Sequence, residues 1–230
     1  MYNKTDMTGY YIIEYLALFL AVLIVLPIHE FAHAFAAVKC GDVTPKVAGR
    51  LTLNPLAHFD VLGLLMIIFA RFGWAKPVPI NPYNFRNRRS GYFWTSIAGV
   101  LSNYLTAIVV YPVLVLFSKY LAFDFLMFDE LLETFLYMVF IISVNLVVFN
   151  LFPVYPLDGF RVLEVATKRR GKVFRFLRQY GYYVLLGLII WSIVVDRLNL
   201  PYYFDVFGVV MGFFTKWLRF PIQAFWGLIL

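Results

Sequence analysis

Six apolar runs, separated by shorter polar stretches, dominate the pattern along this chain. They cover residues 10–38, 60–74, 92–117, 131–152, 180–198 and 202–230. A helix that crosses a bilayer needs roughly 20 predominantly apolar residues, and the first, third, fourth and fifth runs satisfy that length. The second run has only about 15 residues, and the last is interrupted by Lys216, Arg219 and Pro221. The pattern predicts an all-α polytopic membrane protein with five to six transmembrane helices.

The composition excludes the soluble classes. Of the 230 residues, 62% are hydrophobic and 14% are charged, and the mean hydropathy is +0.78. A soluble domain is about half apolar and about a quarter charged. The net charge of +7 therefore does not indicate nucleic-acid binding, because in membrane proteins Lys and Arg collect in cytoplasmic loops. We expect the lipid bilayer, and no nucleic acid, as a partner.

The charged residues also predict how the helices are oriented. Basic residues concentrate in the polar connections 39–59, 75–91 and 160–179, whereas 118–130 carries mainly acidic ones. The positive-inside rule places the three basic connections in the cytoplasm and 118–130 outside. The N-terminus is then outside, and the C-terminus, which follows Lys216 and Arg219, is expected inside.

The short apolar run 60–74 is flanked by two connections that are both predicted to be cytoplasmic. We therefore expect a short re-entrant segment that dips into the membrane and returns, or a segment buried against the bundle. Just before it, the stretch 43–53 mixes β-branched residues with Pro45 and Gly49. A short β-hairpin after the first helix and a plain surface loop are both compatible with that stretch.

The polar connections are too short for a separate globular domain, since the longest have roughly 20 residues. We therefore expect one membrane-embedded domain over 1–230. Its core spans about 10–163, and C-terminal helices occupy about 180–230.

The first candidate site lies inside the first predicted helix. The string His29-Glu30-Phe31-Ala32-His33 fits the pattern H-E-x-x-H. Residues four apart share one helix face, so two imidazoles can bind one zinc ion, and Glu30 can activate a zinc-bound water. The alternative is a pair of buried core histidines with an incidental glutamate, but ionisable groups inside a span are costly and usually functional.

A catalytic zinc usually has three protein ligands, so a third must come from elsewhere in the chain. Cys40 shares a helix face with His33 but lies about 10 Å further along the axis, at 1.5 Å per residue. His58 could reach the site from the re-entrant segment, or it could be an interfacial histidine. Asp158 lies at the rim of the fourth span, after Pro153 and Pro156, which should interrupt the helix. Its carboxylate is an acceptable zinc ligand, and a simple Asp-Gly turn is the alternative.

The two motifs together resemble those of the site-2 proteases, zinc metallopeptidases that cut substrates within the membrane. That family combines H-E-x-x-H, here 29–33, with a later N-x-x-P-x-x-P-x-D-G, here 150–159. The strings at 41–42, 49–55 and 73–79 are similar to those of compact bacterial members, which have no PDZ or CBS domain. One departure is Val100, where relatives often have proline.

The resemblance implies roles for single residues. His29, His33 and Asp158 would bind one Zn²⁺ per chain, and Glu30 would be the general base. Asn150 would hold the substrate backbone or the developing oxyanion. His58 and Asn103 are possible site-lining residues, and for Asn103 an interhelical hydrogen bond is the alternative.

The implied function is that of a zinc-dependent intramembrane endopeptidase, which hydrolyses peptide bonds in or near transmembrane segments of membrane-protein substrates. We expect it in a bacterial cell membrane, with the active site toward the cytoplasm. The partners would be a substrate helix and, since the chain has no separate substrate-selecting domain, a regulatory or adaptor protein. The alternatives are a proteolytically silent scaffold that binds membrane segments and a metal-ion transporter. The intact Glu30 argues against the first, and the single compact polar cluster argues against the second.

Overall fold

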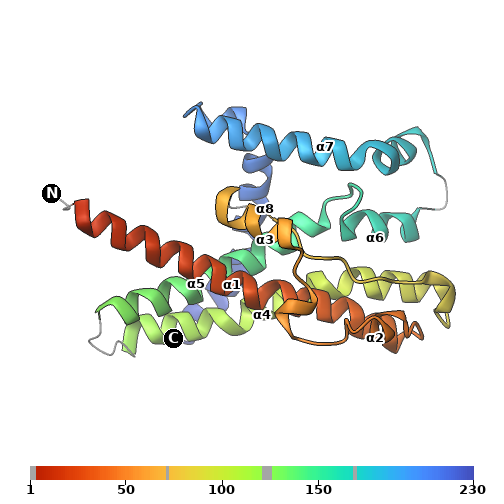
Figure 1. Ribbon diagram of the computed structural model, residues 1–230, viewed down its shortest axis with the longest axis horizontal. Coiled ribbons are helices and arrows are strands. Elements are labelled where there is room, and N and C mark those ends of the chain that lie inside the picture. Colours follow the sequence, from red (N-terminus) through yellow and green to blue (C-terminus); the bar gives the residue numbers. More distant parts are fainter. Residues whose placement is uncertain (1–3, 71–72, 121–125, 168–169) are drawn as a thin grey trace.

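The computed structural model describes residues 4–70, 73–120, 126–167 and 170–230, and in these residues the chain forms helices and loops without a β-strand. The long helices are α1 (Lys4–Lys39), α4 (Arg88–Tyr120), α5 (Leu126–Leu151), α7 (Lys172–Arg197) and α8 (Val206–Gly227) (Figure 1). The short ones are α2 (Thr44–Val47), α3 (Val61–Ala70) and α6 (Asp158–Ala166). The expected all-α architecture is confirmed.

Helices α1, α4 and α5 pack against one another and form the bundle that carries the site. Small and β-branched side chains, including Ala21, Val25 and Val139, make the buried contact between α1 and α5. Because such residues are short, the helix backbones can approach closely, which favours packing in an apolar solvent. A second cluster joins α4 and α5 to α8. Helix α7 runs along the upper edge of Figure 1, where it contacts α8, and its Leu185 and Ile189 pack with Leu157 and with Phe149 of α5.

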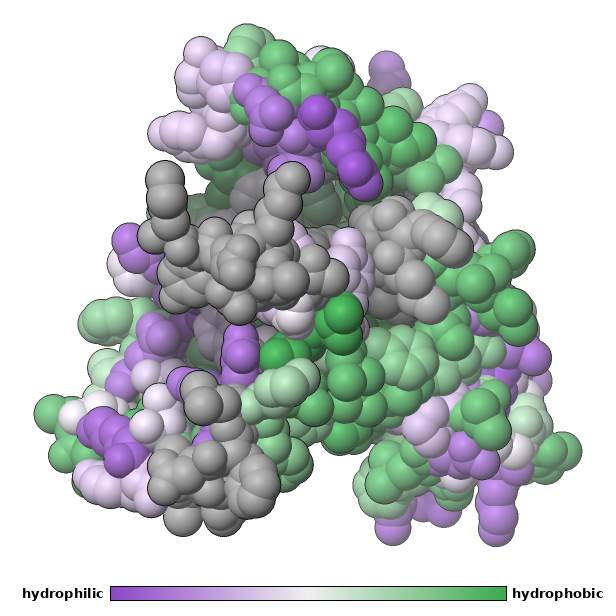
Figure 2. Space-filling view, turned by 60° about the vertical axis from the view of Figure 1, so that its left-hand side comes forward, coloured by the Kyte–Doolittle hydropathy of each residue, from purple (hydrophilic) through white to green (hydrophobic). Residues whose placement is uncertain are grey.

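Among the described residues, four helical segments are long and apolar enough to cross a membrane: Gly9–Lys39, Arg88–Tyr120, Met127–Leu151 and Lys172–Arg197. They correspond to the four long apolar runs of the sequence. Their outward faces are apolar, and Figure 2 shows broad hydrophobic areas on the surface. This confirms the membrane character. Helix α8 is also long but does not meet the same criterion, so a fifth or sixth span stays a prediction.

The residues before and after the short apolar run lie side by side, so the chain makes an excursion from the loop region and returns to it, and its entry into the membrane stays a prediction. Helix α3 occupies most of the run, and the residues that flank the excursion pair with each other. Phe59 and Ala75 form an isolated antiparallel bridge, and the Lys76 N–H donates to the His58 carbonyl at 2.7 Å. Within the excursion, Gly63 lies so close to the Trp74 carbonyl that a Cβ would overlap it.

The β-hairpin considered for residues 43–53 is wrong. The segment instead contains the single helical turn α2 followed by a turn at Gly49, whose φ is +69°. Pro45 occupies the start of α2, where its fixed φ and missing N–H suit a first helical turn. Asp42, just before, accepts the Thr44 N–H at 3.0 Å and supports the same turn.

The C-terminus lies at the other end of the bundle from the one expected. The Lys119 ammonium group donates to the Leu230 carbonyl at 3.0 Å, so the last residue sits beside the end of α4 that leads into 118–130. The cause is the packing of α8, whose Ile222 joins Ala107 and Phe140 in the bundle core and directs the helix back along α4 and α5. Lys216 and Arg219 do not decide the position of this terminus.

The buried carboxylate of Asp42 ties the end of α1 to the loop that precedes α4. It accepts hydrogen bonds from the backbone N–H and hydroxyl of Thr44, from the Asn81 N–H at 2.7 Å and from the Asn84 amide at 2.9 Å. Burial would raise the pKa of this carboxyl, but the hydrogen bonds from Thr44, Asn84 and Asn81 outweigh it and hold the pKa below its ordinary value of 3.8. The ionised form therefore stabilises the fold.

We expect Asp42→Asn to lower the melting temperature at pH 7 by about 5 °C or more, because hydrogen bonds to a charged group contribute roughly 1.5–3 kcal/mol. Since the folded-state pKa is depressed, this contribution is complete above pH 3.8 and is lost as the pH falls through the lowered pKa. Thermal unfolding in detergent micelles at pH 7 and below pH 4 measures both effects, with Asp196→Asn on the exposed surface of α7 as the control. An unchanged melting temperature at pH 7 would contradict the role given to Asp42.

Candidate metal centre

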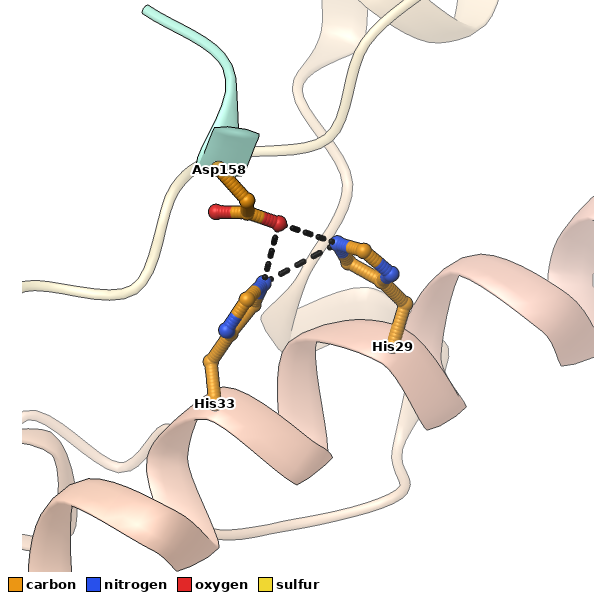
Figure 3. Close-up of side chains that lie close together, drawn as sticks. All are labelled: His29, His33 and Asp158. Atoms are coloured by element: carbon orange, nitrogen blue, oxygen red, sulfur yellow. Dashed lines mark hydrogen bonds and ion pairs between the residues drawn. The ribbon is translucent and has the colours of Figure 1, made fainter. Parts of the chain in front are cut away.

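Two buried histidines on α1 form one side of the site. His29 and His33 are each 4% exposed, and their Nε2 atoms lie 3.0 Å apart. The helical spacing of four residues places both rings on the same face, one turn apart. Figure 3 shows both rings turned toward the same point above the helix.

Asp158 approaches the histidines from the opposite side. Helix α5 ends at Leu151, the segment with Pro153 and Pro156 is non-helical, and α6 begins at Asp158. The Asp158 Oδ2 atom lies 3.4 Å from His29 Nε2 and 3.1 Å from His33 Nε2 (Figure 3). The proline interruption predicted from the sequence is thus present, and it brings the second motif onto the first.

The close approach of the start of α6 to the end of α5 requires a glycine at position 159. A Cβ at Gly159 would overlap the Leu151 carbonyl at the end of α5. Helix α6 therefore starts directly against the last turn of α5. Asp158 and Gly159 are the first two residues of α6, so the alternative of a simple Asp-Gly turn is wrong, and the start of this helix directs the Asp158 carboxylate toward α1.

Helix α4 lies behind the two histidines and contacts the ring nitrogens that face away from Asp158. The His33 Nδ1 atom is 2.7 Å from the Thr95 carbonyl oxygen, and the His29 Nδ1 atom is 3.0 Å from the side-chain amide of Asn103. Positions 95, 99 and 103 are spaced four residues apart and share one face of α4. Each ring is held through Nδ1, so its Nε2 points to the common centre.

The atoms that meet at this centre suit a zinc ion. Two imidazole nitrogens and one carboxylate oxygen all lie within 4.8 Å of one another. Apart from the two ring nitrogens, Asp158 Oδ2 has no hydrogen-bond partner among the residues that the structure describes. Arg161 lies 3.7 Å from the other oxygen, Oδ1, and a divalent cation at Oδ2 would compensate the remaining cost of burying this carboxylate. Two histidines and one carboxylate are a known ligand set of catalytic zinc, with a fourth position open for water.

Gly99 lies between the two contacts that α4 makes, directly behind the rings. A Cβ at this position would be 2.5 Å from His29 Cε1 and 2.5 Å from His33 Nε2. Such distances are far inside van der Waals contact, so any side chain here would displace the imidazoles.

We therefore expect Gly99→Ala to lower the zinc affinity of the protein by at least about 10-fold, in the range that second-sphere changes cause. Zinc per chain after dialysis against a weak chelator measures this. Gly187→Ala on α7 is the matched control, because a Cβ there meets nothing within 4 Å. Normal zinc binding by Gly99→Ala would mean that the two rings are not held as described.

Glu30 lines a small cavity beside the three candidate ligands. An extended segment, residues 76–81, closes this cavity, and we call it the strap. The Val78 N–H of the strap donates to Glu30 Oε2 at 3.3 Å. The cavity has a volume of about 110 Å³. Its wall consists of His29, Glu30, His33, Pro77, Val78, Ile80, Asn150, Pro156, Leu157, Asp158 and Arg161.

Of the other residues considered from the sequence, Asn150 and Asn103 reach the site and two do not. Asn150 lines the cavity, and its amide donates to the Leu146 carbonyl at 3.0 Å. Asn103 does form an interhelical hydrogen bond, and its partner is His29. His58 is fully buried at the base of the re-entrant segment, where its Nε2 is 2.8 Å from the Thr52 carbonyl oxygen. Neither His58 nor Cys40 belongs to the cluster.

Sequence reasoning missed three contributors to the site. Thr95 acts through its backbone carbonyl, which no residue type reveals. Val78 acts through its backbone N–H, and only the flanking prolines indicated an extended segment. Arg161 could have been found, since it follows Asp158 by three residues on α6, and its Nη1 atom lies 3.7 Å from Asp158 Oδ1.

Comparison with known proteins gives consistent matches. The sequence model described as "Peptidase family M50" matches residues 17–192. The protein named "Putative zinc metalloprotease YwhC" of Bacillus subtilis (strain 168) is 38% identical over 175 residues, which are 75% of this chain and 80% of that protein. "Putative zinc metalloprotease Rip2" of Mycolicibacterium smegmatis is 27% identical over 226 residues, 89% of this chain and 80% of that protein. No solved structure matches the chain.

Proposed function

The chain belongs to peptidase family M50 and is a membrane zinc metalloprotease, and on that premise we propose that it is an intramembrane endopeptidase whose substrates are the transmembrane segments of other membrane proteins. The observation that carries the proposal is the buried cluster of His29, His33 and Asp158 beside Glu30, within a bundle of apolar helices. Family membership favours this function over a silent scaffold or a metal-ion transporter.

In the proposed site, His29, His33 and Asp158 hold one Zn²⁺. When bound, zinc polarises the scissile carbonyl and lowers the pKa of a coordinated water. Glu30 accepts the proton of the attacking water and delivers it to the leaving amine, as a general base and then a general acid. Its position next to His29 in the sequence and on the cavity wall supports this role.

Asn150 binds the substrate backbone or the developing oxyanion in the proposed reaction. One N–H of its amide is used by the Leu146 carbonyl, and among the described residues the second N–H and the oxygen remain to bind a peptide group. A donor directed at developing negative charge contributes several kcal/mol to transition-state stabilisation. The hydrogen bond to the Leu146 carbonyl also holds the Asn150 amide in place, so the amide needs no rearrangement before it binds the substrate.

A substrate can enter only if the strap moves. The cavity of about 110 Å³ is well below the roughly 300–1,000 Å³ that ligand sites usually have. The strap is fixed at its ends, where the Lys76 N–H binds the His58 carbonyl and the Asn81 N–H binds Asp42. Pro77 and Pro79 lack an N–H, so between the two ends the bond from Val78 to Glu30 is the contact to be broken.

The substrate itself must lose helical structure near the scissile bond. In a transmembrane helix each carbonyl is engaged by the N–H four residues later. A narrow site next to an extended strap supports a substrate that is extended locally. Helix-breaking residues near the cleavage site should therefore raise the rate of cleavage.

We further propose that the active site faces the cytoplasm of a bacterial cell membrane. Arg161 lines the cavity, Lys76 begins the strap directly before Pro77 of the cavity wall, and many other basic residues flank these positions in the sequence. The positive-inside rule assigns such an end to the cytoplasm. A separate regulatory or adaptor protein is a proposed partner, because the strap must be opened for cleavage.

The function is tested by cleavage of a single-span peptide reconstituted with the protein in liposomes. We expect cleavage to stop with 1,10-phenanthroline, to continue with the non-chelating 1,7 isomer, and to return when Zn²⁺ is resupplied. The purified protein should contain close to one zinc per chain. Cleavage that persists after complete removal of zinc would contradict the proposal, as would a zinc-loaded protein that cleaves no membrane segment, including segments with helix-breaking residues.

A further inference from the structure

Arg161 is a charged residue of the cavity wall that the proposed reaction does not use. It lies on α6 three residues after Asp158, so the two side chains are neighbours on the helix surface. Its Nη1 atom is 3.7 Å from Asp158 Oδ1, and this ion pair is longer than a hydrogen bond. Among the residues that the structure describes, the guanidinium group has no hydrogen-bond acceptor, although it carries five N–H donors. These donors are available to a ligand in the cavity.

The next acidic residue on α6 does not compete for Arg161. Glu164 Oε1 accepts hydrogen bonds from the Arg170 guanidinium at 3.3 Å and from the Arg178 guanidinium at 3.2 Å. In the described part of the chain, Asp158 is therefore the one carboxylate that forms an ion pair with Arg161.

Helix α6 is held in place, and this fixes the start of the Arg161 side chain at the cavity. Phe160, the residue before it, is 1% exposed and stacks on Phe174 of α7, with ring centroids 5.1 Å apart. The ring of Tyr155 packs edge-on against the same phenylalanine. A charged group that is carried by a packed helix is positioned more precisely than one on a loop.

The charges of the cavity wall favour an anionic ligand once zinc is bound. The wall contains two acidic residues, Glu30 and Asp158, and one basic residue, Arg161. Histidines bind a metal as neutral rings, so the two charges of Zn²⁺ balance the two carboxylates and leave the positive charge of Arg161 in excess. Charges interact strongly in a site that excludes water, and a negative group on the ligand would compensate this excess.

We propose that Arg161 binds a carboxylate of the peptide in the catalytic cavity. Arginine matches a carboxylate with two parallel N–H···O hydrogen bonds. Hydrolysis itself produces such a group: the oxygen of water adds to the scissile carbonyl carbon, the C–N bond breaks, and the amine leaves with a proton from the water. The N-terminal fragment then ends in a carboxylate. An acidic side chain of the substrate is the second source of the same chemistry. The inference rests on the proposed function, since it assigns a ligand group to the same cavity.

The test measures peptide binding to the zinc-loaded protein in detergent micelles, with zinc per chain determined on each sample. The first pair of probes is a short acetylated peptide of leucine and alanine that ends either in a carboxylate or in an amide. We expect the preference of Arg161→Gln for the carboxylate to be about 10- to 100-fold smaller than that of the wild type, because hydrogen bonds between charged groups contribute in that range. Each preference is a ratio within one protein, so a general loss of stability cancels.

Arg175→Gln is the matched control, because Arg175 lies on the exposed surface of α7, and it should keep the wild-type preference. A second pair of probes has an amidated end and carries Glu or Gln in its middle. An Arg161-dependent preference for the Glu peptide would identify a substrate side chain as the source of the carboxylate. An Arg161-dependent preference confined to the first pair would identify the new end of the product.

An Arg161→Gln protein that holds zinc and keeps the wild-type preference in both pairs would overturn the inference. If this variant loses zinc, the same ratios are measured with Arg161→Lys, which keeps the charge beside Asp158 but lacks the planar fork of the guanidinium. An unchanged preference there would overturn the inference equally.

The outcomes also separate this inference from the proposed function. A wild-type protein that cleaves the membrane peptide but shows no preference dependent on Arg161 would remove the role of Arg161 alone. A zinc-loaded protein that binds carboxylates through Arg161 and cleaves no membrane segment would contradict the proposed function and leave the role of Arg161 in place.

Discussion

Glu30→Gln is expected to abolish peptide-bond cleavage and to leave zinc bound. Glutamine has nearly the same shape, so it can keep the place of Glu30 on the cavity wall. It cannot accept the proton of the attacking water. General acid–base catalysis contributes about 10²–10⁴-fold to a rate, and we expect a loss of kcat in that range or larger, because one residue performs both proton transfers.

The measurement is single-turnover cleavage of the membrane peptide in liposomes, with zinc per chain determined on the same sample. Glu14→Gln is the matched control, since Glu14 is also on α1 but lines a separate cavity at the end of the bundle near Lys119 and Glu130. A Glu30→Gln protein that retains a tenth or more of the rate would remove Glu30 as the base. Loss of both zinc and activity would instead mean that Glu30 is needed for zinc binding.

Asp158→Ala is expected to lose zinc. The substitution removes one of three candidate ligand atoms that lie within 4.8 Å of one another, and it leaves only the two imidazole nitrogens to bind the metal. Since changes that merely touch a ligand cost 10- to 100-fold in affinity, removal of a ligand should cost more than about 100-fold by the same comparison. Cleavage should fall with the zinc content.

Zinc per chain, measured after dialysis against chelators of graded strength, determines the affinity. Asp196→Ala, on the exposed surface of α7, is the control. If Asp158→Ala binds zinc as tightly as the wild type, Asp158 is not a ligand, and the two motifs do not form one metal site. His58 does not offer an alternative, because it is buried elsewhere and contacts the Thr52 carbonyl.

Both predictions concern residues that the sequence itself identified. The H-E-x-x-H string is local, and the helical repeat alone places His29 and His33 on one face. Pro153 and Pro156 cannot continue a helix, so the interruption before Asp158 was also readable. The apolar runs were long enough to predict membrane helices without any knowledge of their packing.

Other expectations failed because they depended on contacts between distant residues. The β-branched stretch 43–53 forms a helical turn, since Asp42 and Pro45 favour that start and Asp42 also binds Asn81 from beyond the re-entrant segment. The C-terminus was placed by its charges, but packing of Ile222 in the bundle core decided its position. His58 had the chemistry of a ligand, and the loop that surrounds it holds it away from the cluster.

The sequence by itself determined the class of protein, the two motifs and the residues able to bind zinc and to transfer a proton, because each depends on residue type and local spacing. Only the tertiary structure decided how these residues are held. On one face of α4, the Thr95 carbonyl contacts His33 and the Asn103 amide contacts His29. Between them, Gly99 has no side chain and so leaves room for both rings. The strap reaches Glu30 through a backbone N–H. Backbone groups are the same in every residue and the space beside a glycine depends on its neighbours, so the residue pattern could not reveal either.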